Sequence, residues 1–162
     1  MNPDIYFRNY TSFVCDPKEV HGVIVSFSSF QKLPKMYLEV LLVGENRIKT
    51  LNQKHRKIDK PTDVLSFPII EKFKTQNVKC KIVEDSIYDP RTKSYQLKAI
   101  SYPLAMGSVV ICPKVAKIND ESIIDLVVHG LIHLIGYDHE KDGDNDQFCK
   151  ISEEFWTRFS RR

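Results

Sequence analysis

The chain has 162 residues, of which 42% are hydrophobic and 28% are charged, and its formal net charge is +3. This length suffices for one domain, which we expect to span residues 1–162 and to bury a core without disulfide or metal staples. The charge balance is too even to indicate a partner, and no apolar run is long enough to cross a membrane. The cysteines, which form no CxxC pair, predict reduced thiols in a soluble cytoplasmic protein: Cys15, Cys80, Cys112 and Cys149.

The first element that the sequence indicates is a core strand over residues 35–43, where β-branched and aromatic side chains favour a pleated strand. Gly44 ends this strand. The charged segment 45–57 has apolar residues at helical spacing, which predicts a short amphipathic helix on the surface. Pro61 ends that helix.

Two further strands are predicted on either side of a long connection. Residues 62–70 form a proline-bounded stretch that favours an edge strand, and residues 106–113 form a strand that Pro113 ends. The connection over residues 71–105 mixes charges with a turn signal. For this connection we expect either a projecting hairpin or a mobile loop.

A central helix is predicted over residues 123–136, because this run is apolar on nearly all sides. Asn119 or Asp120 can cap it, and Ser122 begins a weak capping box. Gly136 is well placed to adopt a left-handed conformation that turns the chain back beside the helix.

A last helix is predicted over residues 147–159. Its aromatic and aliphatic residues recur at helical spacing and form a stripe that docks on the core: Phe148, Ile151, Phe155 and Phe159. Taken together, the elements predict an α+β fold with a small mixed β-sheet and packed helices.

Three of the five histidines lie within ten residues of one another. His129 and His133 are four residues apart and share a helix face, and the turn at Gly136 can bring His139 to the same point. Three nitrogen ligands and an open fourth position are typical of catalytic zinc, whereas a structural site uses a fourth protein ligand, usually cysteine. No cysteine lies nearby, so the spacing predicts one Zn²⁺ per chain on the central helix.

The spacing H-x-x-x-H-x-x-G-x-x-H resembles that of the metzincin proteases, in which a glutamate after the first histidine acts as general base. Here that position is Gly130, so zinc binding is kept while amide cleavage is disfavoured. Asp138 or Asp142 can accept a ring N–H from a ligand and fix its tautomer. The sequence does not choose between these two carboxylates.

Two motifs resemble the YbeY family, the bacterial zinc-dependent endoribonucleases of ribosomal RNA maturation. They are HGLIHLIGYDHE over residues 129–140 and LNQKHRKIDKPTDVLSFP over residues 51–68. The resemblance implies hydrolysis of single-stranded RNA in small-subunit rRNA maturation and ribosome quality control. It also implies partners, namely the rRNA precursor and the small ribosomal subunit with its assembly factors.

Residue by residue, the resemblance implies that His129, His133 and His139 bind the zinc ion and that Arg56 is catalytic. A guanidinium suits this role because its planar fork matches phosphate oxygens and stays charged. We expect Arg56 to bind RNA phosphates together with two neighbours, Lys57 and Lys60. The alternative for this basic segment is a solvated surface.

The chain departs from the family pattern at three places. Ser108 follows Gly107 where the family has an aspartate, the connection over 71–105 is longer, and the segment 113–122 is shorter. Any role of the family aspartate in the site is therefore missing or supplied elsewhere. The two changes in length affect the rim of the predicted cleft and leave the ligands in place.

Two other functions stay open from the sequence, a metallopeptidase and a non-catalytic ribosome-assembly factor with structural zinc. The attacking group, hydroxide or the ribose hydroxyl, also stays open.

Overall fold

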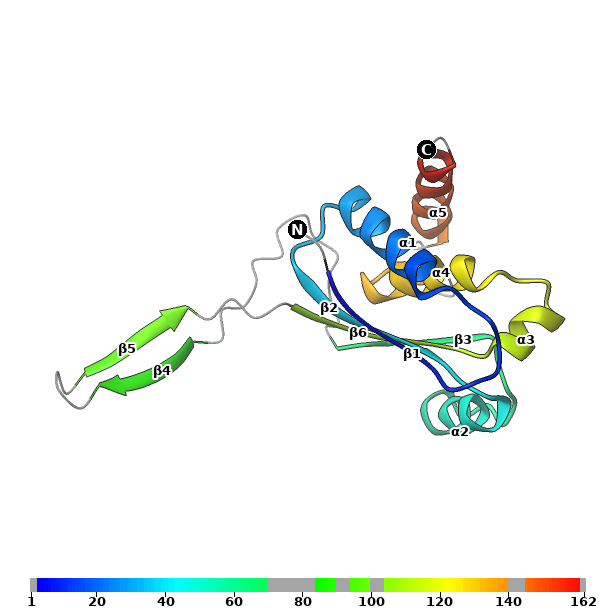
Figure 1. Cartoon of the computed structure of the whole chain (residues 1–162), viewed down its shortest axis with the longest axis horizontal. Coiled ribbons are helices and arrows are strands. Elements are labelled where there is room, and N and C mark those ends of the chain that lie inside the picture. The colour runs from blue at the N-terminus through cyan, green and yellow to red at the C-terminus, as the bar shows by residue number, and fades with distance from the viewer. Residues whose placement is uncertain (1–2, 70–83, 90–93, 100–103, 140–144, 161–162) are drawn as a thin grey trace.

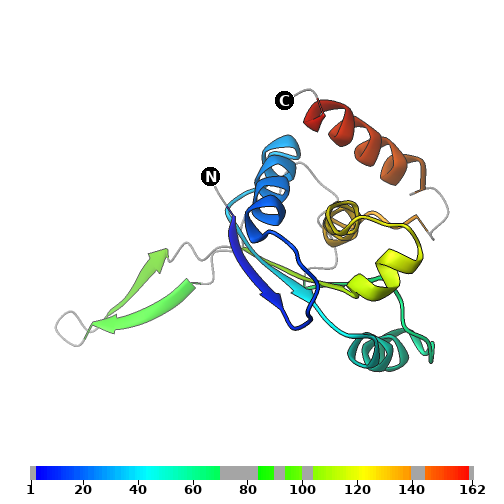
Figure 2. The same cartoon turned by 45° about the vertical axis from the view of Figure 1, so that its right-hand side comes forward.

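The computed structural model describes residues 3–69, 84–89, 94–99, 104–139 and 145–160. Most of the connection predicted over residues 71–105 therefore lies outside the described residues. Within it, β4 (Glu84–Asp89) and β5 (Ser94–Ala99) pair antiparallel with each other. Both views show this hairpin beyond the end of the main sheet, so the described part adopts the hairpin alternative (Figures 1 and 2).

The main sheet has four strands in the order β1-β2-β6-β3. These strands are β1 (Asp4–Asn9), β2 (Met36–Leu42), β6 (Leu104–Ile111) and β3 (Val64–Pro68). The first three run parallel, and β3 pairs antiparallel with β6. The prediction of a small mixed sheet is thus confirmed, and so is the position of β3 at an edge.

Helices cover both faces of this sheet unequally (Figures 1 and 2). One face carries α1 (Pro17–Phe30), α4 (Ile123–Leu134) and α5 (Asn145–Phe159). The opposite face carries only α2 (Glu45–Arg56) among the described helices, while α3 (Pro113–Ile118) links β6 to α4. This arrangement confirms the α+β class.

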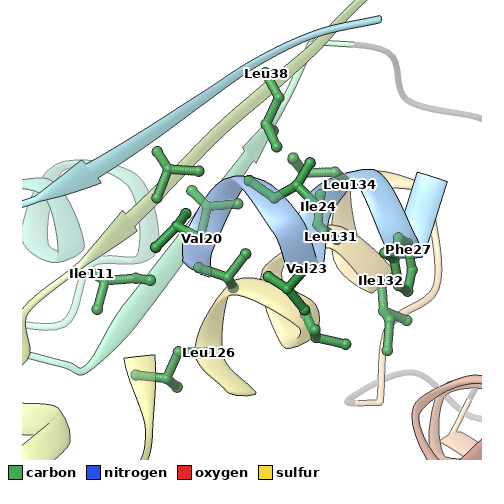
Figure 3. Close-up of a cluster of buried hydrophobic side chains, with 14 of the residues drawn as sticks. Val20, Val23, Ile24, Phe27, Leu38, Ile111, Leu126, Leu131, Ile132 and Leu134 are labelled. Atoms are coloured by element: carbon green, nitrogen blue, oxygen red, sulfur yellow. The ribbon is translucent and has the colours of Figure 1, made fainter. Parts of the chain in front are cut away.

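The main core lies between the sheet and the three-helix face (Figure 3). Val23 and Ile24 of α1 meet Leu131 of α4, and Leu38 of β2 closes the cluster from the sheet. Each such side chain contributes about 1.5–3 kcal/mol by leaving water. Because α4 contacts β3, β6, α1 and α5, it is buried on nearly all sides, as its sequence predicted.

A smaller core lies under α2, on the other face of the sheet. Its buried residues are Val43, Ile48, Leu65, Val110 and Cys112. They occupy the end of the sheet where β2 and β6 finish. One half of this sheet face is therefore covered by α2, and no described helix covers the half near the start of β2.

The residues that end α4 are those that the sequence predicted, with one correction at its N-terminus. Ser122, not Asn119 or Asp120, is the N-cap, and its hydroxyl accepts from the backbone N–H of Asp125. Asn119 instead ends α3, a helix that the sequence did not reveal. At the other end Gly136 has the predicted positive φ, +98°.

Among the described residues, no helix combines the length and apolarity that crossing a membrane requires. Cys15, Cys112 and Cys149 are free thiols, as predicted, and Cys80 lies outside the described residues.

Candidate metal centre

Three imidazoles from α4 and the turn after it meet at one point. His129 and His133 are one helical turn apart, and their Nε2 atoms are 3.1 Å from each other. The turn is closed by backbone N–H groups of Gly136 and Tyr137, which donate to carbonyls of the last helical turn. This reversal brings His139 to the pair, so one ring nitrogen from each histidine lies within 4.8 Å of the others.

The cluster is backed by an aromatic ring from α5. The ring of Phe148 lies with its centroid 5.0 Å from those of His129 and His133 and 5.1 Å from that of His139. Phe148 is itself buried. The sequence predicted it as a core residue, and the stripe spacing gave no signal that the same side chain also forms a wall of the histidine cluster.

The environment keeps the first histidine neutral. Burial, together with the nearby charges of His133 and His139, lowers the pKa of His129 to about 4. A neutral imidazole has a free ring lone pair and is the form that binds metal ions. The donor set therefore fits a metal ion such as zinc, because three imidazole nitrogens at one point leave a fourth position open.

A cleft of about 610 Å³ opens in front of the cluster. All five residues of β3 line it, together with the last two residues of α2, the face of α4 that carries His129 and His133, and the turn that carries His139. Because β3 is an edge strand, the cleft passes over its free side. Tyr137 and Asp138 also line it, whereas Asp142 lies outside the described residues.

The predicted basic residues separate in space. Arg56 ends α2 and lines the same cleft as the histidines. Lys57 takes a left-handed conformation as the C-cap of α2, and its ammonium donates to the carbonyl of Lys54. Lys60 is exposed, and its carbonyl accepts from the side chain of buried Asn52. Neither lysine lines the cleft, so Arg56 alone of the three shares it with the histidines.

A pair of carboxyl groups that also lines the cleft, Asp63 and Glu121, was not predicted from the sequence. Asp63 precedes β3 and accepts hydrogen bonds from the hydroxyl of Thr62, the backbone N–H of Val64 and the amide of Asn119. Although partial burial opposes it, these bonds and one from Glu121 lower the pKa of Asp63. Burial and the nearby Asp63 carboxylate raise the pKa of Glu121 to about 7.

Gly130, the residue after His129, faces the sheet. A Cβ at Gly130 would lie 2.6 Å from Cγ1 of Val109 and 3.1 Å from the hydroxyl of Ser66. Because α4 packs so closely on β6, only glycine fits there. A glutamate at this position, as in the metzincins, would collide with β6.

Ser108, which replaces the family aspartate, lies on the opposite face of the sheet from α4. Its hydroxyl donates to the Glu39 carboxylate at 2.7 Å, and it is paired with Phe67 of β3. It does not line the cleft. This departure therefore leaves the histidine cluster untouched.

Comparison with known proteins agrees with the two sequence motifs. Residues 16–160 match the family described as Endoribonuclease YbeY. The solution structure of TM1509 from Thermotoga maritima is 23% identical with a TM-score of 0.49, covering 98% of this chain and 92% of that one.

Two relatives have the same name, Endoribonuclease YbeY. The protein from Aquifex aeolicus is 35% identical over 123 residues, which are 76% of this chain and 69% of the relative. The protein from Leptospira interrogans is 33% identical over 125 residues, which are 72% of this chain and 82% of the relative. With the family match and these identities, the chain belongs to the endoribonuclease YbeY family.

Proposed function

We propose that this protein is a zinc-dependent endoribonuclease that hydrolyses phosphodiester bonds within single-stranded RNA. The observation that carries the proposal is the shared cleft, in which Arg56 and three histidine nitrogens face the same volume. His129, His133 and His139 would hold one Zn²⁺, which supplies Lewis acidity and lowers the pKa of water to about 7.

Arg56 anchors the scissile phosphate in this proposal. Its planar guanidinium donates to two phosphate oxygens at once, and it offsets negative charge that builds up on them in the transition state. Lys57 and Lys60 lie outside the cleft, so their contribution is to attract the RNA backbone rather than to contact the reacting phosphate.

A peptidase is less well supported by the same cleft. The general base of a metzincin follows its first histidine, and here Gly130 is pressed against Val109 of the sheet. A purely structural zinc site is also less well supported, because such sites normally have four protein ligands. Among the described residues, the cluster provides three.

The cellular substrate in this proposal is the rRNA precursor of the small ribosomal subunit, and the partners are that subunit and its assembly factors. The work is rRNA maturation and ribosome quality control in the cytoplasm. The shared name of the relatives supports an RNA substrate. The free thiols of Cys15, Cys112 and Cys149 suit a reducing compartment.

The test is a cleavage assay on unstructured RNA labelled at one end. We expect internal cuts that a strong chelator abolishes and added zinc restores. His133→Ala should lose both bound metal and cleavage, whereas Arg56→Lys should keep the metal and lose cleavage about 10²-fold or more, because a lysine cannot form the fork. An unfolded protein substrate should stay intact.

The same assay contains the results that would refute the proposal. Cleavage that persists in His133→Ala would belong to a contaminating nuclease. A parent protein that binds RNA and zinc without cutting would be an assembly factor, and one that cuts only the protein substrate would be a peptidase.

A further inference from the structure

The described helices cover only half of the sheet face opposite α4. In the strand register, Tyr6, Glu39, Ser108 and Phe67 form one row across β1, β2, β6 and β3. Their neighbours Ile5 and Phe7 pack into the main core, so this row points away from α4. In both views α2 lies at the other end of this face (Figures 1 and 2).

Exposed tyrosines lie on and beside this row, and two tyrosines near it contact arginines. Tyr6 is 37% exposed and Tyr37 is 39% exposed. The Arg8 guanidinium lies 4.9 Å above the centroid of the Tyr6 ring and donates to its hydroxyl. At the end of β1, Arg47 of α2 lies 5.5 Å above the ring of Tyr10. We name the surface of Tyr6, Arg8, Tyr37, Ser108 and Phe67 the open sheet face.

The charges of this surface are balanced, so stacking rather than net charge would hold a nucleic acid here. Asp4 pairs with Lys35 at 3.2 Å, and Glu39, whose carboxylate accepts from the hydroxyl of Ser108 at 2.7 Å, keeps its negative charge. Arg8 contacts Tyr6 and pairs with no carboxylate of the described residues, so its guanidinium is available to a phosphate.

The open sheet face is continuous with the cleft. Phe67 belongs to the row across the sheet and also lines the cleft. His55, beside Arg56 at the end of α2, lies with its ring 4.9 Å from that of Phe67 and lines the cleft as well. A strand of RNA that leaves the histidine cluster across the edge at β3 therefore meets Phe67 first.

We propose that the open sheet face binds unpaired RNA bases adjacent to the phosphate in the cleft, by stacking them on Tyr6, Tyr37 and Phe67. Aromatic side chains on a sheet surface bind single-stranded RNA in this way, because every base has a flat π-face. Arg8 contributes contacts to the phosphates. The inference rests on the proposed function for its RNA substrate, and it names the surface that selects single strands over duplexes.

The test uses the zinc-loaded protein and a 2′-O-methyl RNA of about 12 nucleotides, a length within the usual range of single-strand sites. Loss of two stacking platforms in the double variant Tyr6→Leu with Tyr37→Leu should weaken its binding roughly tenfold or more in fluorescence anisotropy. Binding of the matching duplex and cleavage of an RNA of about four nucleotides should not change. Phe13→Leu, in the loop after β1 and 38% exposed, is the matched control.

Two single variants separate stacking from charge and keep the test independent of the stability of the sheet. Tyr37→Phe keeps the ring and should bind like the parent. Arg8→Gln should lower the salt dependence of binding by about one phosphate contact.

The outcomes separate the two proposals. If the folded tyrosine variants bind the long RNA as tightly as the parent, the open sheet face is not an RNA surface, whether or not the parent cleaves. If the tyrosine variants bound single-stranded RNA and duplex RNA with equally weakened affinity, that result would also contradict stacking. If the tyrosines are needed for binding but the parent cuts no RNA, the surface assignment holds and the proposed function fails.

Discussion

Gly130 has a hydrogen atom where other residues have a side chain, and this allows α4 to approach the sheet closely. A methyl group added at this position would meet Val109 first, a fully buried residue in the middle of β6. Gly130 and Val109 are both buried, so neither residue can move aside at low cost. The close approach fixes the height of His129 and His133 above β3 and therefore the depth of the cleft.

We expect Gly130→Ala to destabilise the protein by about 1–3 kcal/mol, the usual cost of overpacking a core. Urea unfolding followed by circular dichroism measures this change. Gly22→Ala is the matched control, because Gly22 is an exposed helical glycine with nothing within 4 Å of a Cβ. The free energy of unfolding of Gly22→Ala should be about 0.5–1 kcal/mol higher than that of the parent. A Gly130→Ala variant as stable as Gly22→Ala would contradict the packing account.

The Asp63–Glu121 pair makes stability depend on pH. The pKa of Glu121 is raised to about 7, from an ordinary value of 4.5. The folded state therefore keeps a proton that the unfolded chain has lost, and the stabilisation by this proton is full below pH 4.5 and lost as the pH rises through 7. The lowered pKa of Asp63 acts oppositely, since its stabilisation is lost in acid.

We expect Glu121→Gln to remove this dependence, because a glutamine donates to Asp63 at every pH. The melting temperature of the variant minus that of the parent should rise by about 1–2 °C between about pH 5 and pH 8, a small value because Glu121 is exposed. Asp120→Asn, at the adjacent position, should show no such rise. A difference that stays constant with pH would exclude a shared proton.

At the scale of elements, the hairpin of β4 and β5 stands apart from the metal centre. Its strands pair with each other in their own two-stranded sheet and add no strand to the main sheet. Replacing residues 84–99 by a short Gly-Ser linker should therefore preserve cooperative unfolding and metal binding. Calorimetry and metal analysis of the shortened protein check this. Loss of the folded state would show that the hairpin supports the main core.

The elements that the sequence predicted are those with a strong local pattern. β2, β6, α4 and α5 have clear apolar periodicity, and Gly44 and Gly136 mark two of their boundaries. Two of the three missed elements, β1 and α3, have mixed patterns, whereas α1 was missed although Val20, Val23, Ile24 and Phe27 recur on it at helical spacing. β1 alternates Ile5 and Phe7 with exposed Tyr6 and Arg8 in a charged context, and Pro113 ends β6 while it also begins α3, where its fixed φ is an advantage.

The residues of the candidate site also fall into two groups, those that the sequence could predict and those that it could not. The histidine cluster could be predicted because its members lie within eleven residues on one helix and its turn, so local geometry brings them together. Phe148 and the Asp63–Glu121 pair could not, because each comes from an element whose position depends on the tertiary packing. The place of Arg56 in the cleft depended on how α2 packs under β3, which no local pattern encodes.

At the scale of the molecule, the sheet separates two surfaces that the edge strand β3 joins. α4 presents the histidines on one side, and α2 presents Arg56 and His55 from the other, so the cleft forms where the two meet around the free edge. A central, rigid helix holds the histidines at fixed spacing. This arrangement suits a flexible polymer substrate that crosses the edge and continues over the sheet.

In the proposed function, one zinc ion in the three-histidine cluster makes the protein an endoribonuclease. The most direct test is to remove the metal, titrate zinc back and record bound metal and RNA cleavage in the same samples. Cleavage should rise linearly with added zinc and stop rising at one ion per chain, with no response in His133→Ala. Full cleavage by the metal-free protein, or a metal-loaded protein that leaves RNA uncut, would contradict the proposed function.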